Sequence, residues 1–220
     1  MKTKPKQQGD RLLGSLYCSK FLLELSWVDV ADDLLASAAL LEPEIRKVWA
    51  NRRASYRARS QGQEPVRLIA DRYTGPYFML VSYAVENLFK AALVRENKQS
   101  YEQEFDEKGE LPEELRDHEL VKLAEKVGFR FDRYKEDLLR RLTRCAKWHG
   151  RYPVPLHYRE TAGGENSKSE RKRYSVSYFG GNDIERLKTL MNDLRVSLNL
   201  PTRRRDLPPC ERQGPEASDA

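Results

Sequence analysis

Cysteine is scarce in this chain of 220 residues, and its spacing excludes two of the residue's common roles. The three cysteines, Cys18, Cys145 and Cys210, lie far apart, form no Cys-x-x-Cys pair and are odd in number. Such spacing fits neither a zinc site nor a disulfide framework. We therefore expect a protein of the reducing cytosol, with no bound metal ion.

The sequence also lacks the motifs of common nucleotide and metallopeptidase sites. No Gly-x4-Gly-Lys-[Ser/Thr], Gly-x-Gly-x-x-Gly or His-Glu-x-x-His pattern occurs, and each of these patterns would mark a phosphate or zinc site. Gly14-Ser15 is not followed by the paired aspartates of a nucleotidyltransferase signature. We therefore expect no cofactor.

No apolar run is both long enough and free enough of charge to predict a membrane span. Tyr77 to Val94 is the most apolar stretch, but Glu86 and Lys90 lie inside it. Charges at mid-span are costly in a bilayer. No apolar segment of the signal-peptide type follows residues 1–10. We expect a buried core helix in a cytoplasmic protein.

The sequence does contain apolar residues at helical spacing along most of its length. With 39% hydrophobic residues, the chain can form one core. Alternation of the strand type occurs only over residues 174–178, and one strand makes no sheet. The spacing predicts the following helices: 27–41, 43–62, 76–95, 118–128, 134–149 and 184–196.

These patterns predict an all-α fold, an up-and-down bundle of five to six helices. We expect a single helical domain over residues 20–198, with a basic, turn-rich loop at 159–173. Residues 1–19 are expected to be flexible. The Pro-rich, charged tail at 199–220 is expected to be disordered.

The net charge of +6 and a pI of about 9.1 suit an anionic partner. A basic run contains Arg52 and Arg53, with Trp49 and Tyr56 between its arginines. In nucleic-acid-binding proteins such mixtures give phosphate contacts and base stacking. Alternatively, the aromatic residues belong to the core and the arginines form a solvated helix face.

Residues 144–155, RCAKWHGRYPVP, combine Arg144 and His149 at the predicted end of a helix. Imidazole can transfer a proton near neutral pH, and guanidinium can hold a phosphate. In a straight α-helix five residues turn through about 500°, which leaves the two side chains roughly 140° apart. Gly150 and Pro153 predict that the helix ends near Trp148, and an unwound last turn would let the two converge. Alternatively, His149 is a partly buried cap and Arg144 faces solvent.

Glu86 and Lys90 lie four residues apart within the most apolar helix, a spacing that favours an intrahelical ion pair. In a second interpretation, Glu86 orients a basic group at the end of the bundle, either Arg144 or Arg151. His118 is interpreted as a residue near a helix N-terminus.

Three segments together resemble HEPN-type domains. Residues 77–94, YFMLVSYAVENLFKAALV, resemble the helix of that family that carries Glu and Lys four apart. Residues 118–128, HELVKLAEKVG, are similar to its short helix that begins with His. Residues 144–155 contain an Arg-x4-His motif like the Arg-x4-6-His motif of the family's ribonucleases. In active members the residue after this Arg is usually polar, whereas here it is Cys145.

The resemblance implies an RNA-binding helical bundle and, in its nuclease form, a metal-independent endoribonuclease of a defence or toxin–antitoxin system. Arg144 would contact the scissile phosphate and His149 would be the acid–base group. The candidate binding residues are Glu86, Lys90, Lys147, Trp148, Arg151, Tyr152, Arg52 and Arg53.

The resemblance also implies certain partners. They are RNA, an antitoxin or nucleotidyltransferase, and a second copy in a homodimer, and no membrane is implied. The alternative is a catalytically silent helical scaffold. Such a scaffold would bind a protein or nucleotide in a pocket near Glu86, Lys90 and Trp148.

Overall fold

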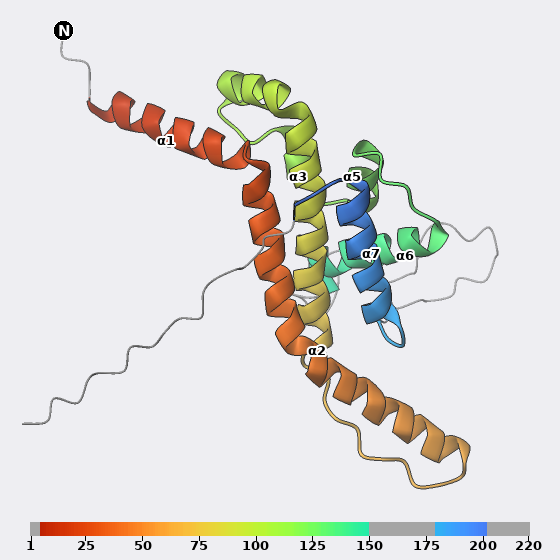
Figure 1. The fold of residues 1–220 in the computed structure, drawn as a ribbon. Helices are drawn as coiled ribbons and strands as arrows, with labels where there is room; N and C mark the ends of the chain where they lie inside the picture. Colours follow the sequence, from red (N-terminus) through yellow and green to blue (C-terminus); the bar gives the residue numbers. More distant parts are fainter. Residues whose placement is uncertain (1–4, 150–178, 202–220) are drawn as a thin grey trace, which may run out of the picture.

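The described residues of the computed structural model are 5–149 and 179–201, with side chains described for 12–147 and 179–201. These residues form seven α-helices and one π-helical turn and contain no strand, which confirms the all-α prediction (Figure 1). Arg151, Tyr152, the loop at 159–173 and the stretch at 174–178 lie outside them, as do residues 202–220 of the predicted tail.

The described helices follow one another along the chain in a simple order. Their bounds are α1 Pro5–Phe21, α2 Glu24–Ser60, α3 Thr74–Lys108, α4 Glu113–Arg116, α5 Leu120–Lys126, α6 Arg133–Arg144, the π-turn η1 Cys145–His149, and α7 Asp183–Ser197.

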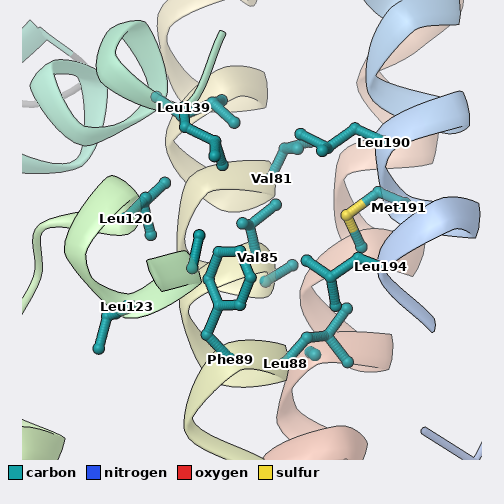
Figure 2. Packing of buried hydrophobic residues seen from close by; sticks show 14 of the residues in the cluster. Val81, Val85, Leu88, Phe89, Leu120, Leu123, Leu139, Leu190, Met191 and Leu194 are labelled. Atoms are coloured by element: carbon teal, nitrogen blue, oxygen red, sulfur yellow. The ribbon is translucent and has the colours of Figure 1, made fainter. Parts of the chain in front are cut away.

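Helix α3 is the centre of the core. Its middle turns are buried on nearly every side, as expected for a helix surrounded by others. Helix α2 lies alongside it, and α5, α6 and α7 cover its other sides (Figure 1). Figure 2 shows the packing of Val81, Val85, Leu88 and Phe89 of α3 with Leu120 and Leu123 of α5, Leu139 of α6, and Leu190, Met191 and Leu194 of α7.

Among the described helices, α3 alone is long and apolar enough to cross a membrane by length and composition. However, 78% of its most apolar window is buried inside the protein. The packing of α3 therefore agrees with the predicted core helix.

The predicted helix boundary at Pro43 was wrong, because α2 continues through this residue. Proline removes one backbone hydrogen bond and kinks a helix without having to end it. Figure 1 shows α2 changing direction part-way along its length. Buried residues on both sides of the proline, such as Ala38 before it and Ile45 after it, hold the two halves on the same core.

Helix α1 occupies most of the segment that the sequence predicts to be flexible. Its last turns pack on the far end of α3, where the ring of Phe105 lies 5.7 Å from Tyr17 and 5.4 Å from Phe21, centroid to centroid. The chain bends at Asn97, close to the predicted end near residue 95, where φ of −119° and ψ of 19° are not helical, and α3 reaches Phe105 because it continues beyond this kink to Lys108. Gly109, with φ of 68°, ends it in the left-handed conformation.

Candidate functional site

The three segments that resemble HEPN-type domains meet in space. The hydroxyl of Ser82 on α3 donates to the carbonyl of Leu142 on α6 at 2.8 Å, and that of Tyr83 donates to the carbonyl of Ala146 on η1 at 3.2 Å. At the start of α5, the backbone N–H of Leu120 donates to Oγ1 of Thr143 at 3.1 Å. The middle of α3, the start of α5 and the α6–η1 junction therefore form one region, which we call the junction site.

The chain at the end of α6 differs from the straight helix predicted over residues 134–149. The α-helix stops at Arg144, and residues Cys145 to His149 form a π-turn. A π-helix pairs residue i with residue i+5, so positions five apart lie about one turn apart along its axis. Arg144, the last residue of α6, and His149, the last residue of η1, have this separation along the chain. The side chains of Trp148 and His149 lie outside the described part of the chain.

Cys145, where active HEPN members are usually polar, is a core residue. It is buried, and its Sγ lies 3.7 Å from the carbonyl oxygen of Gly75 at the start of α3. Burial raises the pKa of the Cys145 thiol to about 12. A thiol that stays protonated is a poor nucleophile. Cys145 therefore packs η1 against α3.

The guanidinium of Arg144 is half-buried and has few polar partners within the described residues. Its Nε is buried without a hydrogen-bond partner, and within the described residues Arg144 makes no ion pair. Burial lowers the pKa of Arg144, and the nearby Arg141 and Arg140 lower it further against the opposing effect of Asp137. Unsatisfied donors in such a place can serve an anionic ligand.

The neighbouring Arg141 has a structural role instead. Its Nη1 and Nη2 donate to the two carboxylate oxygens of Asp183 on α7, at 2.8 and 3.2 Å. Its guanidinium also lies 5.1 Å from the centroid of the Phe179 ring. Arg141 thus joins α6 to the start of α7.

Glu86 and Lys90 form a buried ion pair on α3. The residues are 6% and 4% exposed, and Nζ of Lys90 lies 2.6 Å from Oε1 of Glu86. The ammonium group also lies 5.9 Å from the ring centroid of Trp27 on α2. The second carboxylate oxygen, Oε2, is buried without a partner. A buried pair with one unsatisfied oxygen is costly, and replacement by apolar residues is often neutral or stabilising.

Besides Lys90, the basic side chain that contacts Glu86 is His118, which the sequence pattern places near a helix N-terminus. Nδ1 of His118 lies 2.9 Å from Oε1 of Glu86 across 32 positions of sequence. No ion pair joins Glu86 to Arg144 among the described residues. The N-cap of α5 is Glu119, which is adjacent to His118. No local sequence pattern links positions so far apart, and for this reason the pairing was missed.

The contact between His118 and Glu86 is suited to proton transfer. The carboxylate accepts from Nδ1–H, which leaves Nε2 as the nitrogen able to accept a proton. The His118 side chain is 59% exposed, and Nε2 has no partner among the described residues. The Nδ1 side of this imidazole is therefore held by the protein, and its Nε2 side is open to a ligand.

Lys147 and Arg52, two candidate binding residues, both have carboxylate partners. Nζ of Lys147 forms an ion pair with Glu119 and thereby fixes η1 to the start of α5. Nη2 of Arg52 lies 3.2 Å from Oδ2 of Asp71. Neither cation is therefore fully available to a ligand.

The basic run belongs to a projecting part of the molecule that we call the basic arm, residues 46–73. It consists of the last turns of α2 and the segment 61–73 that runs back beside them (Figure 1). The two are joined by Asn51, whose Nδ2 donates to the Arg67 carbonyl at 3.0 Å and whose Oδ1 accepts from the Ile69 N–H at 2.8 Å.

The two aromatic residues of the basic run have separate roles. Trp49 is 6% exposed, and its ring lies 6.4 Å from that of Phe78, so it belongs to the core. Tyr56 is 71% exposed. Arg53 is exposed as well. Trp49 therefore agrees with the interpretation that places the aromatic residues in the core, whereas the exposed Tyr56 does not.

The arm and the η1 part of the junction site both adjoin the first turns of α3. The arm begins where Trp49 stacks on Phe78, and η1 packs where Cys145 contacts Gly75. Phe78 and Gly75 both belong to the first turns of α3. A ligand on the arm could thus extend to the π-turn.

Comparison with models of known protein families, with curated proteins and with solved structures finds no match. The resemblance to HEPN-type domains therefore stays a prediction from three short segments. Within the described residues, no group of three or more His, Cys, Asp or Glu side chains is arranged to hold a metal ion.

Proposed function

We propose that this protein is HEPN-like, binds RNA and cleaves it without a metal ion. The observation that supports the proposal is the junction site itself. Three segments far apart in sequence, each similar to the same family, come together around Glu86, His118 and the π-turn after Arg144.

The reaction is attack by an RNA 2′-hydroxyl on its own phosphodiester. A base takes the proton of the 2′-hydroxyl while its oxygen bonds to phosphorus. The bond from phosphorus to the 5′-oxygen breaks, and an acid gives a proton to that oxygen. The products are a 2′,3′-cyclic phosphate and a 5′-hydroxyl.

Each role in this reaction has a candidate residue. In this proposal His149 and His118 carry the two proton transfers. Arg144, whose Nε is buried without a hydrogen-bond partner, stabilises the charge that develops on the phosphate. Glu86 is a positioning residue, because its carboxylate holds the His118 ring. Lys90 is the oppositely charged partner of Glu86 in the buried ion pair.

The test is incubation of the purified protein with single-stranded RNA in EDTA, beside single variants of each histidine. The chain has three histidines, so His157→Ala, outside the proposed chemistry, is the matched control. We expect His149→Ala and His118→Asn each to lower the cleavage rate by about 100-fold or more, as is usual for loss of an acid–base group. His157→Ala should cleave like the wild type.

The pH profile separates the two roles. With two proton-transfer groups, the wild-type rate should be bell-shaped in pH, and each variant should lose one limb. Absence of cleavage by the wild type, in a folded sample, would reject the nuclease and favour the silent scaffold. Binding to an antitoxin or a nucleotidyltransferase, and pairing of two copies, belong to the same proposal.

A further inference from the structure

The charge of this molecule is concentrated in the basic arm. Residues 46–73 contain eight Lys or Arg residues and two Asp or Glu residues, a net charge of +6. The whole chain also has a net charge of +6. The remaining 192 positions are thus neutral in sum. The net charge of the whole protein is therefore equal to the net charge of this one projection.

Most of this charge is not neutralised by neighbouring carboxylates. Arg46, Lys47 and Arg52 each form an ion pair. By contrast, the following arginines of the arm make no ion pair within the part of the chain that the structure describes: Arg53, Arg57, Arg59, Arg67 and Arg72. Unpaired cations on a projection produce a positive potential that attracts a polyanion.

The outer face of the arm also presents an aromatic ring. Arg53, Tyr56 and Arg57 are spaced i, i+3 and i+4 on α2 and therefore share one face. All three are exposed, whereas Ser55 and Ala58 on the opposite face are buried. Two arginines beside an exposed tyrosine can hold phosphates while a base stacks on the ring.

The arm keeps its shape without a ligand. Asn51 bridges α2 and the returning segment with both its donor and its acceptor, and Arg52 pairs with Asp71 near the foot of the arm. Asp71 Oδ1 in turn accepts from the N–H of Thr74, at the start of α3, at 3.1 Å. The binding face is therefore largely formed before a ligand arrives, which lowers the entropy cost of binding.

We propose that the outer face of the basic arm, formed by Arg53, Tyr56 and Arg57, together with the exposed Arg59 at its side, binds single-stranded RNA and feeds it toward the junction site. A single strand fits because an unpaired base can reach the tyrosine ring, whereas a duplex offers only its backbone. The choice of RNA over DNA rests on the proposed function, since the chemistry there needs a 2′-hydroxyl.

Binding is measured by fluorescence anisotropy with a labelled, single-stranded 2′-O-methyl RNA of mixed sequence. This probe lacks the attacking hydroxyl, so binding is read separately from cleavage. The test variant is Arg53→Gln/Arg57→Gln/Arg59→Gln. The matched control, Lys98→Gln/Lys122→Gln/Arg130→Gln, removes the same charge from exposed positions outside the arm. Circular dichroism checks that both variants are folded.

Each phosphate contact to a single strand contributes about 0.7 to the slope of log Kd against log salt. The arm variant should therefore have a slope lower by about 2 and bind roughly 10- to 100-fold more weakly near physiological salt. The control should bind like the wild type. Tyr56→Ala should weaken binding by about fivefold or more through lost stacking, and Tyr56→Phe should retain it.

Several results would overturn the proposal. They are wild-type protein that does not bind the probe, an arm variant that binds like the wild type, and an equal loss in the control. A duplex of the same sequence that binds as tightly would overturn the assignment to single strands. Tight binding through the arm by a protein that does not cleave unmodified RNA would reject the nuclease and leave the arm's role supported.

Discussion

The buried ion pair of Glu86 and Lys90 allows a quantitative test of how α3 is packed. Lys90→Met removes the cation and leaves a carboxylate that is 6% exposed without its charged partner on α3. Removal of one partner of a buried pair typically costs about 3–5 kcal/mol. For a domain of this size, that corresponds to a fall in Tm of roughly 10 °C.

The double variant Glu86→Leu/Lys90→Met should behave differently. It replaces both charges by apolar side chains, so the core no longer contains an unpaired charge. We expect its free energy of unfolding to lie within about 1 kcal/mol of the wild type, or above it. The difference in free energy of unfolding between the single and the double variant measures the cost of burying one charge without its partner.

The assay is urea unfolding followed by far-UV circular dichroism, with both variants and a surface control. Lys108→Met breaks the more exposed pair with Glu104, which has the same i, i+4 spacing, and should leave the unfolding midpoint unchanged. If Lys90→Met is as stable as the wild type, or the double variant is as unstable as Lys90→Met, the account of this pair is refuted.

Three further predictions concern the core and the α6–α7 connection. Phe89→Ala, at a fully buried position, should lower the free energy of unfolding by about 3–5 kcal/mol in the same urea assay. Burial alone would raise the pKa of Asp183, but its hydrogen bonds with Arg141 and the Gly180 N–H lower it overall. The resulting stabilisation is present at neutral pH and is lost as the pH falls through the lowered pKa, so Asp183→Asn should be less stable than the wild type at pH 7, and the difference should shrink only once the pH falls below the ordinary Asp pKa of about 3.9. With the other two cysteines changed to serine, Cys145 should react with a thiol reagent at pH 8 far more slowly in the native protein than in urea, because burial raises its pKa to about 12.

Local patterns predicted the parts of this fold that depend on local packing. The apolar residues of α3 indicated a core helix, and those before Gly128 indicated α5, because helical periodicity records which face is buried. Pro43 gave the wrong boundary, since only tertiary contacts on both sides of it show that α2 continues. Helix α1 was missed for the same reason, because Phe105, its partner, lies far along the chain.

The candidate site was predictable only as separate pieces. The Glu86–Lys90 pair follows from spacing, and the Arg144–His149 motif from its residue types. That His118 is the partner of Glu86 depends on how α5 approaches α3, which no local pattern records. The π-turn was also not predictable, because five consecutive residues carry no signal that separates it from an ordinary helix end.

The distribution of charge over the molecule has a kinetic consequence. The arm carries a charge of +6 on a chain whose other residues sum to zero, so it is a centre of positive potential. In the field of a polyanion such a molecule rotates before contact, so that encounters begin at the arm and not at a random face. Productive association should therefore be faster than shape alone allows, and added salt should slow it more than it speeds dissociation. The arm would thus act as a guide that sets the orientation of the protein during diffusion.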